Sequence, residues 1–172
     1  MKIIYKIILS LLLILILSIT CIYFVTNKEL FDAESDVVEC SNCNECDGGT
    51  NIRIPEGTES IGVSAFNDCS SIKSVVMPDS VISIMNFAFF KCNNLTMIEI
   101  GKNVESIGER AFYECRALQS VVIPDEVITM DYMAFCWCDS LASLDIGKSV
   151  QTIGRFAFGW CSTLASVIIP DS

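Results

Sequence analysis

Apolar residues recur at a fixed interval of 23 residues throughout residues 51–172. Numbering each unit from the proline or glycine that follows an apolar triplet places position 1 at Pro55, Pro78, Gly101, Pro124, Gly147 and Pro170. Positions 4, 7, 18, 21 and 23 are aliphatic in nearly every unit. Position 11 is alanine, position 12 phenylalanine and position 15 cysteine in all five units. Because chance does not maintain such a register, these residues form an array of internal repeats.

The columns predict the local structure of each unit. Positions 18–23 follow the pattern L-x-x-V-x-I, which would place positions 21 and 23 on one face of a short strand. Positions 11–15 follow A-F-x-x-C, which would place phenylalanine and cysteine on one side of a short helical turn. One unit cannot bury its apolar face alone, whereas stacked units can. The pattern therefore predicts an α/β repeat solenoid of five stacked 23-residue units, with a parallel sheet and short helical turns.

The spacing and the residue types resemble the BspA-like leucine-rich repeats, also called the treponemal type, whose unit runs close to IPxSVxxIGxxAFxxCxxLxxVxI. The match covers the whole repeat region and is clearest at residues 107–115 (IGERAFYEC) and 123–127 (IPDEV). Met85 and Asp131 depart from the glycine at position 8, and Thr58 departs from the valine at position 4. Similar proteins are surface antigens and adhesins of bacteria and protists. The resemblance therefore implies binding rather than catalysis, without supplying a ligand or functional residues.

An uncharged stretch lies near the N-terminus. Residues 7–25 are 19 residues rich in isoleucine and leucine, enough for a helix that crosses a bilayer. The two lysines in residues 1–6 favour a cytoplasmic start. A retained signal-anchor is one interpretation; a cleaved signal peptide ending near residues 18–21 and a lipoprotein modified at Cys21 are the alternatives. Each of them exports the rest of the chain, so we expect a membrane or cell-surface location, or secretion if the segment is cleaved.

Residues 26–50 are predicted to form an acidic stalk. Seven acidic residues and no base fall within residues 29–50, and like charges keep a chain extended. The stalk contains Cys40, Cys43 and Cys46 in a CxxCxxC pattern. In an exported segment these cysteines favour disulfides, within the stalk or between chains. The alternatives are free thiols and a metal site, which would need a carboxylate as its fourth ligand.

The composition narrows the classes of function. The net charge of −10 argues against a nucleic-acid-binding protein. The absence of histidine excludes Ser-His-Asp and Cys-His catalysis and every histidine-ligated metal site. We therefore expect neither an enzyme nor a bound cofactor. The cysteine column at position 15 is expected to be a row of buried free thiols, with disulfides between neighbouring units as the alternative. Cys136 lies outside the column and could be reactive or pair with a stalk cysteine.

A second period, of 46 residues, runs through the array. Position 2 alternates in charge, with Asp79, Lys102, Asp125, Lys148 and Asp171. On stacked units these residues would form an alternating ladder of acids and bases along one edge. Such a ladder would fix the register of stacking, because a slipped register would bring like charges together. The alternative is a row of solvated charges left by duplication of a two-unit segment.

The outward face of the predicted sheet is the first candidate binding surface. It is rich in small residues and mildly acidic, and its members at positions 20 and 22 are Ser74, Val76, Met97, Glu99, Ser120, Val122, Ser143, Asp145, Ser166 and Ile168. Such a face could accept a flat or cationic partner. The alternative is an ordinary solvated sheet surface.

Aromatic residues outside the core columns form the second candidate surface. They occupy positions 9, 10, 13 and 14 and are Phe87, Phe90, Tyr113, Tyr132, Trp137, Phe156 and Trp160. Trp137 and Trp160 share position 14 on neighbouring units and should therefore lie side by side. Exposed aromatic side chains in a patch indicate a contact surface. The alternative is that several of them fold inward and widen the core.

Residues 164–169 would form an apolar edge strand with no capping unit. The sequence could be a fragment, or this edge could pair with another copy. Together these features predict a membrane-anchored, outward-facing repeat protein that serves adhesion or binds a protein or glycan ligand. The alternative is a structural or truncated repeat protein without a specific ligand.

Overall fold

The computed structural model describes residues 37–38, 50–167 and 170. The predicted N-terminal span, the three cysteines of the predicted stalk, and Ile168 of the predicted sheet face lie outside the described residues. Within that part of the chain, no helix is long and apolar enough to span a bilayer.

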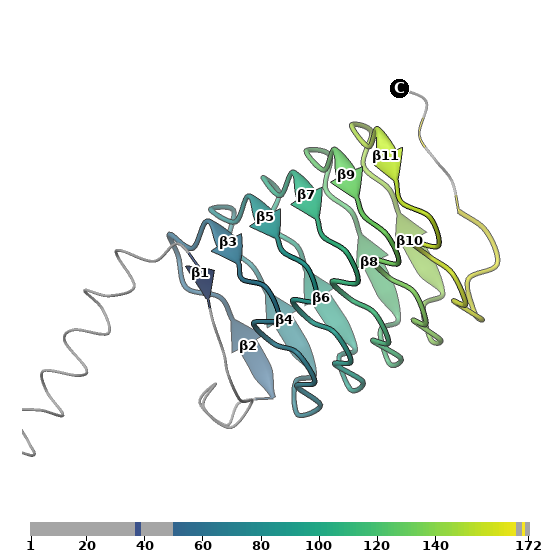
Figure 1. Cartoon of the computed structure of the whole chain (residues 1–172), viewed down its shortest axis with the longest axis horizontal. Helices are drawn as coiled ribbons and strands as arrows, with labels where there is room; N and C mark the ends of the chain where they lie inside the picture. Colours follow the sequence, from purple (N-terminus) through teal and green to yellow (C-terminus); the bar gives the residue numbers. More distant parts are fainter. Residues whose placement is uncertain (1–36, 39–49, 168–169, 171–172) are drawn as a thin grey trace, which may run out of the picture. The chain divides into compact units, whose positions relative to one another are not determined.

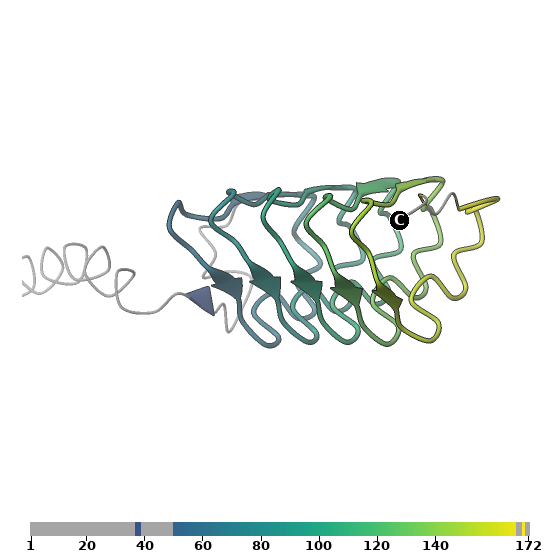
Figure 2. The same ribbon diagram turned by 90° about the horizontal axis from the view of Figure 1, so that it is seen from above.

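Each of the first four units contributes one strand to each of two parallel sheets, and the fifth contributes a strand to the first sheet (Figure 1). In order, the described strands of the first sheet are β1 (Val37–Val38), β3 (Ser60–Ile61), β5 (Ser83–Ile84), β7 (Ser106–Ile107), β9 (Thr129–Met130) and β11 (Thr152–Ile153). Those of the second sheet are β2 (Asn51–Arg53), β4 (Ser74–Val76), β6 (Met97–Glu99), β8 (Ser120–Val122) and β10 (Ser143–Asp145). Paired residues are 23 apart, as in Ser60 with Ser83 and Val75 with Ile98. One repeat is therefore one turn of a solenoid, whose strands lie in rows when seen from above (Figure 2).

The second sheet is the predicted one, and the first was not predicted. The strands of the second sheet cover positions 20–22, and their middle residue is buried between two outward-facing ones in β6, β8 and β10. The strands of the first sheet are only two residues long, at positions 6 and 7. A two-residue strand shows no alternation of apolar and polar residues, so the sequence pattern could not reveal it.

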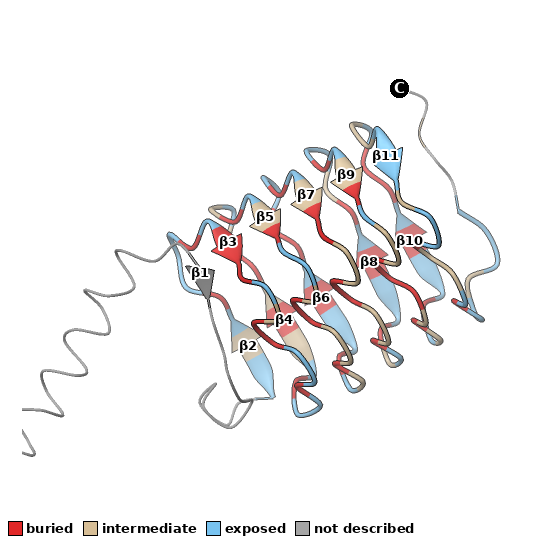
Figure 3. Ribbon diagram, viewed as in Figure 1, coloured by how far each residue is buried: buried red, intermediate tan, exposed pale blue. Residues whose placement is uncertain are grey.

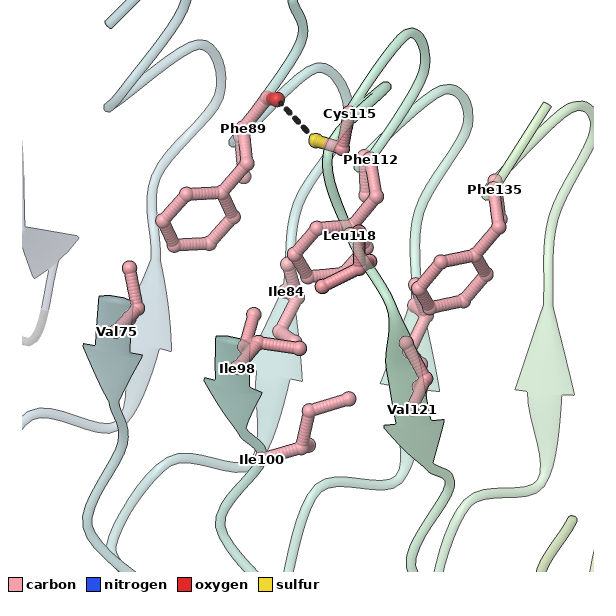
Figure 4. Packing of buried hydrophobic residues seen from close by; sticks show 14 of the residues in the cluster. Val75, Ile84, Phe89, Ile98, Ile100, Phe112, Cys115, Leu118, Val121 and Phe135 are labelled. Carbon is pink, nitrogen blue, oxygen red and sulfur yellow. Dashed lines mark hydrogen bonds between the residues drawn. The ribbon is translucent and has the colours of Figure 1, made fainter. Parts of the chain in front are cut away.

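The interior of the coil is filled by the predicted apolar columns (Figures 3 and 4). The rings of Phe66, Phe89, Phe112 and Phe135 are buried and stack in a row, with centroids 4.9, 5.1 and 4.8 Å apart. Phe158 continues the row at 5.5 Å from Phe135. Stacked rings contribute roughly 0.5–1.5 kcal/mol per pair beyond the area they bury. The phenylalanine column therefore ties each unit to its neighbours.

The short helical turns predicted at positions 11–15 are absent from the described residues, which form a β-solenoid rather than an α/β one. Residues at positions 10 and 14 of all five units are left-handed, with φ between 51° and 63°. Only three residues separate them, fewer than one α-helical turn. The turn amides instead donate to carbonyls of the next unit, as Phe89 N does to Ala111 O at 2.7 Å. Stacking between units thus satisfies the backbone groups that a helix would have paired internally.

The cysteine column is buried, as predicted. Each S–H of the four free thiols donates to the phenylalanine carbonyl of the preceding unit at 3.1–3.3 Å; these thiols are Cys92, Cys115, Cys138 and Cys161. Cys69 is disulfide-bonded, so the prediction of a free thiol is wrong there. Cys136 is free and buried, and burial raises its pKa to about 11. Its thiol stays protonated at neutral pH, which argues against the predicted reactivity or pairing.

The 46-residue period corresponds to pairs of units joined by aspartate–lysine contacts. Asp79 pairs with Lys102, and Asp125 pairs with Lys148 at 2.9 Å. In each pair the aspartate also accepts a hydrogen bond from the lysine backbone N–H, at 3.1 and 3.2 Å. Among the described residues, no ion pair joins Lys102 to Asp125. The predicted continuous ladder is therefore two separate pairs, and Asp171 lies outside the described residues.

Glycine at position 1 follows the same alternation for a steric reason. A Cβ atom on Gly101 would lie 2.2 Å from the backbone oxygen of Pro78, and one on Gly147 would lie 2.2 Å from that of Pro124. Because both obstacles are backbone atoms, no rotation of a side chain can relieve the clash. The two units of a pair therefore approach closely at this corner of the coil.

Candidate functional site

The predicted sheet face lies on the outside of the second sheet. Met97 and Val122 are 52% and 61% exposed, while Ser74 and Val76 are half-buried. Glu99, Ser120, Ser143 and Asp145 are exposed on its strands, and Ser166 is exposed but lies outside the sheet, because residues 164–167 do not form the predicted edge strand. Arg53 of β2 stands in register with Val76 and adds one base to this face, which the sequence reasoning missed. The surface is flat and of mixed polarity.

The seven predicted aromatic residues come together in one network, which we call the aromatic belt. Its rings sit on the turns at positions 9–14 and span four consecutive units. On the first two of these units, Phe90 stacks on Tyr113 with centroids 5.1 Å apart and meets Phe87 edge-on at 5.6 Å. On the last two, Trp137 stacks on Trp160 at 5.6 Å and 3° between planes.

Phe156 and Arg110 connect the two halves of the belt. The ring of Phe156 lies 5.3 Å from that of Trp160 and meets Tyr132 edge-on at 6.5 Å. The Arg110 guanidinium lies 5.0 Å from the Tyr132 ring centroid and 5.8 Å from that of Phe87. The seven rings therefore form one continuous group rather than separate exposed residues.

The belt lies outside the buried core. None of its seven rings belongs to the core cluster, and none is fully buried. Phe156 and Trp160 are 40% and 51% exposed, and the other five are half-buried. The alternative expected from the sequence, in which several of these rings widen the core, is therefore not what the structure has.

Four of the rings sit on strained backbone. Phe87, Trp137, Phe156 and Trp160 have φ of 60°, 63°, 59° and 56°. A bulky residue in the left-handed region is uncommon and costs about 1–2 kcal/mol relative to its preferred conformation. Glycine or asparagine would occupy these positions at lower cost, yet none of the ten left-handed turn positions carries either.

Cationic side chains accompany the rings, and the sequence reasoning missed them. Apart from Arg110, they are Lys91 over Phe90 at 5.3 Å, Arg116 over Trp137 at 5.6 Å and Arg155 over Phe156 at 4.6 Å. Each such contact contributes about 0.5–1 kcal/mol at an exposed site. Four of the eight bases in residues 51–172 thus lie on the belt. Their positions in the same turns as the rings could have signalled this.

Carboxylates neutralise two of these four cations. Arg110 pairs with Glu109, and Arg116 pairs with Glu114 at 3.0 Å and with Asp139 at 2.9 Å. The hydrogen bond that Arg116 donates to Glu114 raises the pKa of Arg116, which stays charged. Within the part of the chain that the structure describes, Lys91 and Arg155 have no carboxylate partner. These two residues are the unneutralised positive charges of the belt.

An acidic groove lies elsewhere, at positions 2, 3 and 5 of the first four units. It has a volume of about 470 Å³ and its lining includes Glu59, Asp79, Glu105 and Glu126. The lysine partner Lys102 holds the pKa of Asp79 below its usual value. The described residues contain no group of three or more carboxylate, cysteine or histidine side chains placed to hold a metal ion. The groove therefore has no arrangement suited to metal binding.

The repeat is matched by a known family. The BspA type leucine-rich repeat region matches residues 37–165 in six copies, one more than the five units counted from the sequence. The match begins at residue 37, where β1 adds a strand to the first sheet. No curated protein matches the chain.

Solved structures of bacterial leucine-rich repeat proteins share the fold. A leucine-rich cell surface protein from Faecalibacterium prausnitzii is 34% identical over 72% of this chain and 33% of its own, with a TM-score of 0.68. The T. pallidum leucine-rich repeat protein is 31% identical over 69% of this chain and 57% of its own, with a TM-score of 0.67. A leucine-rich repeat protein from Bacteroides capillosus is 36% identical over 58% of this chain and 78% of its own, with a TM-score of 0.53.

This chain thus spans a third of the first relative and just over half of the second. The two parallel sheets and the stacked phenylalanine and cysteine columns, together with the match over residues 37–165, lead to one conclusion: the chain belongs to the BspA-type leucine-rich repeat family.

Proposed function

We propose that this chain is a non-enzymatic cell-surface protein that binds its partner, a protein or a glycan, through the aromatic belt. The observation that carries the proposal is the belt itself, two groups of rings that Arg110 joins outside the core. The relationship to a leucine-rich cell surface protein supports the location. Repeat solenoids serve as extended binding scaffolds, which supports the absence of catalysis.

The energetics favour an interface at the belt. Burying a phenylalanine side chain completely stabilises a protein by about 1.5–3 kcal/mol, and the exposed Phe156 and Trp160 forgo part of this. A partner that covers these two rings would recover the missing burial. Tryptophan, tyrosine and arginine are also the residues that dominate the binding energy of protein interfaces.

The sheet face is the alternative surface within the same function. Its exposed Met97 and Val122 are flanked by Glu99 and Asp145 and have no aromatic residue among them. Side chains of this kind contribute less to interfaces than aromatic and arginine anchors do. The belt is therefore the stronger candidate, and variants of the two surfaces can be compared in the same binding assay.

Anchoring at the membrane, with the repeats facing outward, is the second part of the proposal. It is supported by the 19 uncharged residues 7–25, the lysines before them and the acidic residues after them. Protease added to intact cells should remove the repeats and leave a membrane-bound N-terminal fragment. Full protection of the repeats in intact cells, with digestion only after lysis, would show that the chain faces inward.

Binding can be tested with the full chain, kept in mild detergent, on cultured epithelial monolayers and on immobilised mucin. The belt variant combines Phe156→Ala with Trp160→Ala, and the sheet-face variant combines Met97→Ala with Val122→Ala. Val63→Ala is the matched control, because Val63 is 61% exposed at the same turn but in the first unit, four units before Phe156 and Trp160. Urea unfolding midpoints establish that each variant is folded.

The proposal expects the belt variant to lose at least about tenfold in affinity, which corresponds to 1.4 kcal/mol. The Val63→Ala and sheet-face variants should bind as the unaltered chain does. Loss of binding only in the sheet-face variant would move the site to the second sheet. Equal binding by all folded variants would refute both surfaces, whereas no binding even by the unaltered chain would favour a structural protein without a ligand.

A further inference from the structure

We infer that the partner that the aromatic belt recognises is an acidic segment of a protein, held by carboxylate contacts to Lys91 and Arg155. This inference rests on the proposed function of the belt and specifies its ligand class. Three features of the belt lead to it: the charge of its side chains, the ring faces that its own contacts already cover, and its residue types.

The belt holds half of the bases of an acidic domain. Residues 51–172 contain 14 acidic residues and 8 bases, yet four of those bases lie on the belt. Arg110 and Arg116 are neutralised by carboxylates of the chain itself. Lys91 and Arg155 are not, and they lie on the second and fifth units of the array, beside rings at either end of the belt. An anionic partner would therefore meet an uncompensated charge at each end.

Neighbouring rings and cations cover part of the ring faces of the belt. Each of the seven has a face covered by another ring or by a cation. Trp137, for example, is contacted by Arg116 from the preceding unit and by Trp160 from the following one. The edge of an aromatic ring carries the positive end of its quadrupole and therefore attracts carboxylates. A sugar ring, by contrast, binds an aromatic side chain by lying on an open face, and each ring of the belt has at most one face left for this.

The stacked guanidinium of Arg155 suits a carboxylate in particular. A guanidinium that lies over a ring keeps its N–H donors pointing outward in its own plane, where they can bind both oxygens of a carboxylate. The remaining residue types match those of protein interfaces, in which tryptophan, tyrosine and arginine anchor the contact. Acidic residues of a partner protein, set among apolar ones, complement this surface in both charge and polarity.

The test is a selection of random dodecapeptides against the full chain in mild detergent, with hyaluronate as the acidic polysaccharide probe. Selected peptides should be enriched in aspartate and glutamate, and Lys91→Glu and Arg155→Glu should each weaken their binding about tenfold. Lys73→Glu is the matched control, because it makes the same charge change at an exposed position away from the belt. It should bind the selected peptides as the unaltered chain does.

The outcomes separate this inference from the proposed function. Peptides without acidic enrichment, or equal loss of binding in Lys73→Glu and Lys91→Glu, would overturn it. Belt-dependent binding of hyaluronate with no peptide selected would also overturn it, in favour of an acidic glycan. If the Phe156→Ala and Trp160→Ala variant loses cell binding while both charge reversals keep it, the proposed function stands and the inference fails.

Discussion

Replacing Phe112 with alanine tests how the stacked phenylalanine column holds the units together. Phe112 is 0% exposed and lies between Phe89 at 5.1 Å and Phe135 at 4.8 Å. A phenylalanine-to-alanine change in a core costs about 3–5 kcal/mol, and the loss of two stacked contacts places this one near the upper limit. Phe158 is the internal comparison, since it is only half-buried and stacks with Phe135 alone, at 5.5 Å. Its replacement should cost about 2 kcal/mol.

The two variants can be compared by urea unfolding of the full chain in mild detergent, followed by circular dichroism. A difference of about 3 kcal/mol between them corresponds to a separation of at least about 1 M in midpoint, given slopes of about 1–3 kcal/mol/M. Phe112→Ala should unfold at the lower urea concentration. Equal midpoints, or a lower midpoint for Phe158→Ala, would refute the view that stacking and burial within the column set the stability.

Three other predictions concern contacts between neighbouring units and the burial of Cys136. Gly101→Ala should lower the thermal midpoint by several degrees, because its Cβ would lie 2.2 Å from the backbone oxygen of Pro78; an unchanged midpoint would show that the corner relaxes freely. The hydrogen bond that Lys102 donates to Asp79 lowers the pKa of this carboxyl, so the pair stabilises the fold above pH 3.8 and loses this effect as the pH falls through the lowered pKa. NMR titration should find the pKa of Asp79 below 3.8, and a value at or above 3.8 would contradict the pairing. Burial raises the pKa of Cys136 to about 11, so iodoacetamide at pH 8 should leave this thiol unmodified in the folded chain and modify it in urea. Peptide mapping measures the modification, and labelling of Cys136 in the folded chain would contradict its burial.

The repeat made much of this fold predictable. Each core column has one role in every unit, so five examples of a pattern replace the single example that most sequences offer. Positions 21 and 23 were expected to face inward, and Val75, Val121 and Ile123 are buried. The stacking of Trp137 on Trp160 follows from their shared position on neighbouring units.

The features that could not be predicted depend on geometry between units. The first sheet escaped notice because its strands are two residues long and β5 and β7 offer a single buried residue each, Ile84 and Ile107. The left-handed residues that replace a helix are not glycine or asparagine, so nothing in residues such as Lys91 or Trp137 marks them. The cations on the rings depend on side-chain conformation, and the contact of Arg110 with both Phe87 and Tyr132 crosses three units.

The alternating charges at position 2 were predicted correctly only as pairs of an aspartate with a lysine. Asp79 with Lys102 and Asp125 with Lys148 were expected to be links in one ladder. The structure instead closes each pair separately, because the same aspartate also binds the backbone N–H of its lysine. The steric closeness at Gly101 explains why the paired units alternate in sequence.

The central claim, that the aromatic belt is the binding surface, can be tested most directly by hydroxyl-radical footprinting of the full chain, free and bound to epithelial cells. The chain has two tryptophans and both lie in the belt, while Met97 reports on the sheet face and is 52% exposed. Mass spectrometry gives the oxidation of Trp160, Phe156 and Met97 in the same sample. The account predicts that Trp160 and Phe156 are protected on binding while Met97 oxidises as before. Protection of Met97 with unchanged oxidation of Trp160 would contradict it.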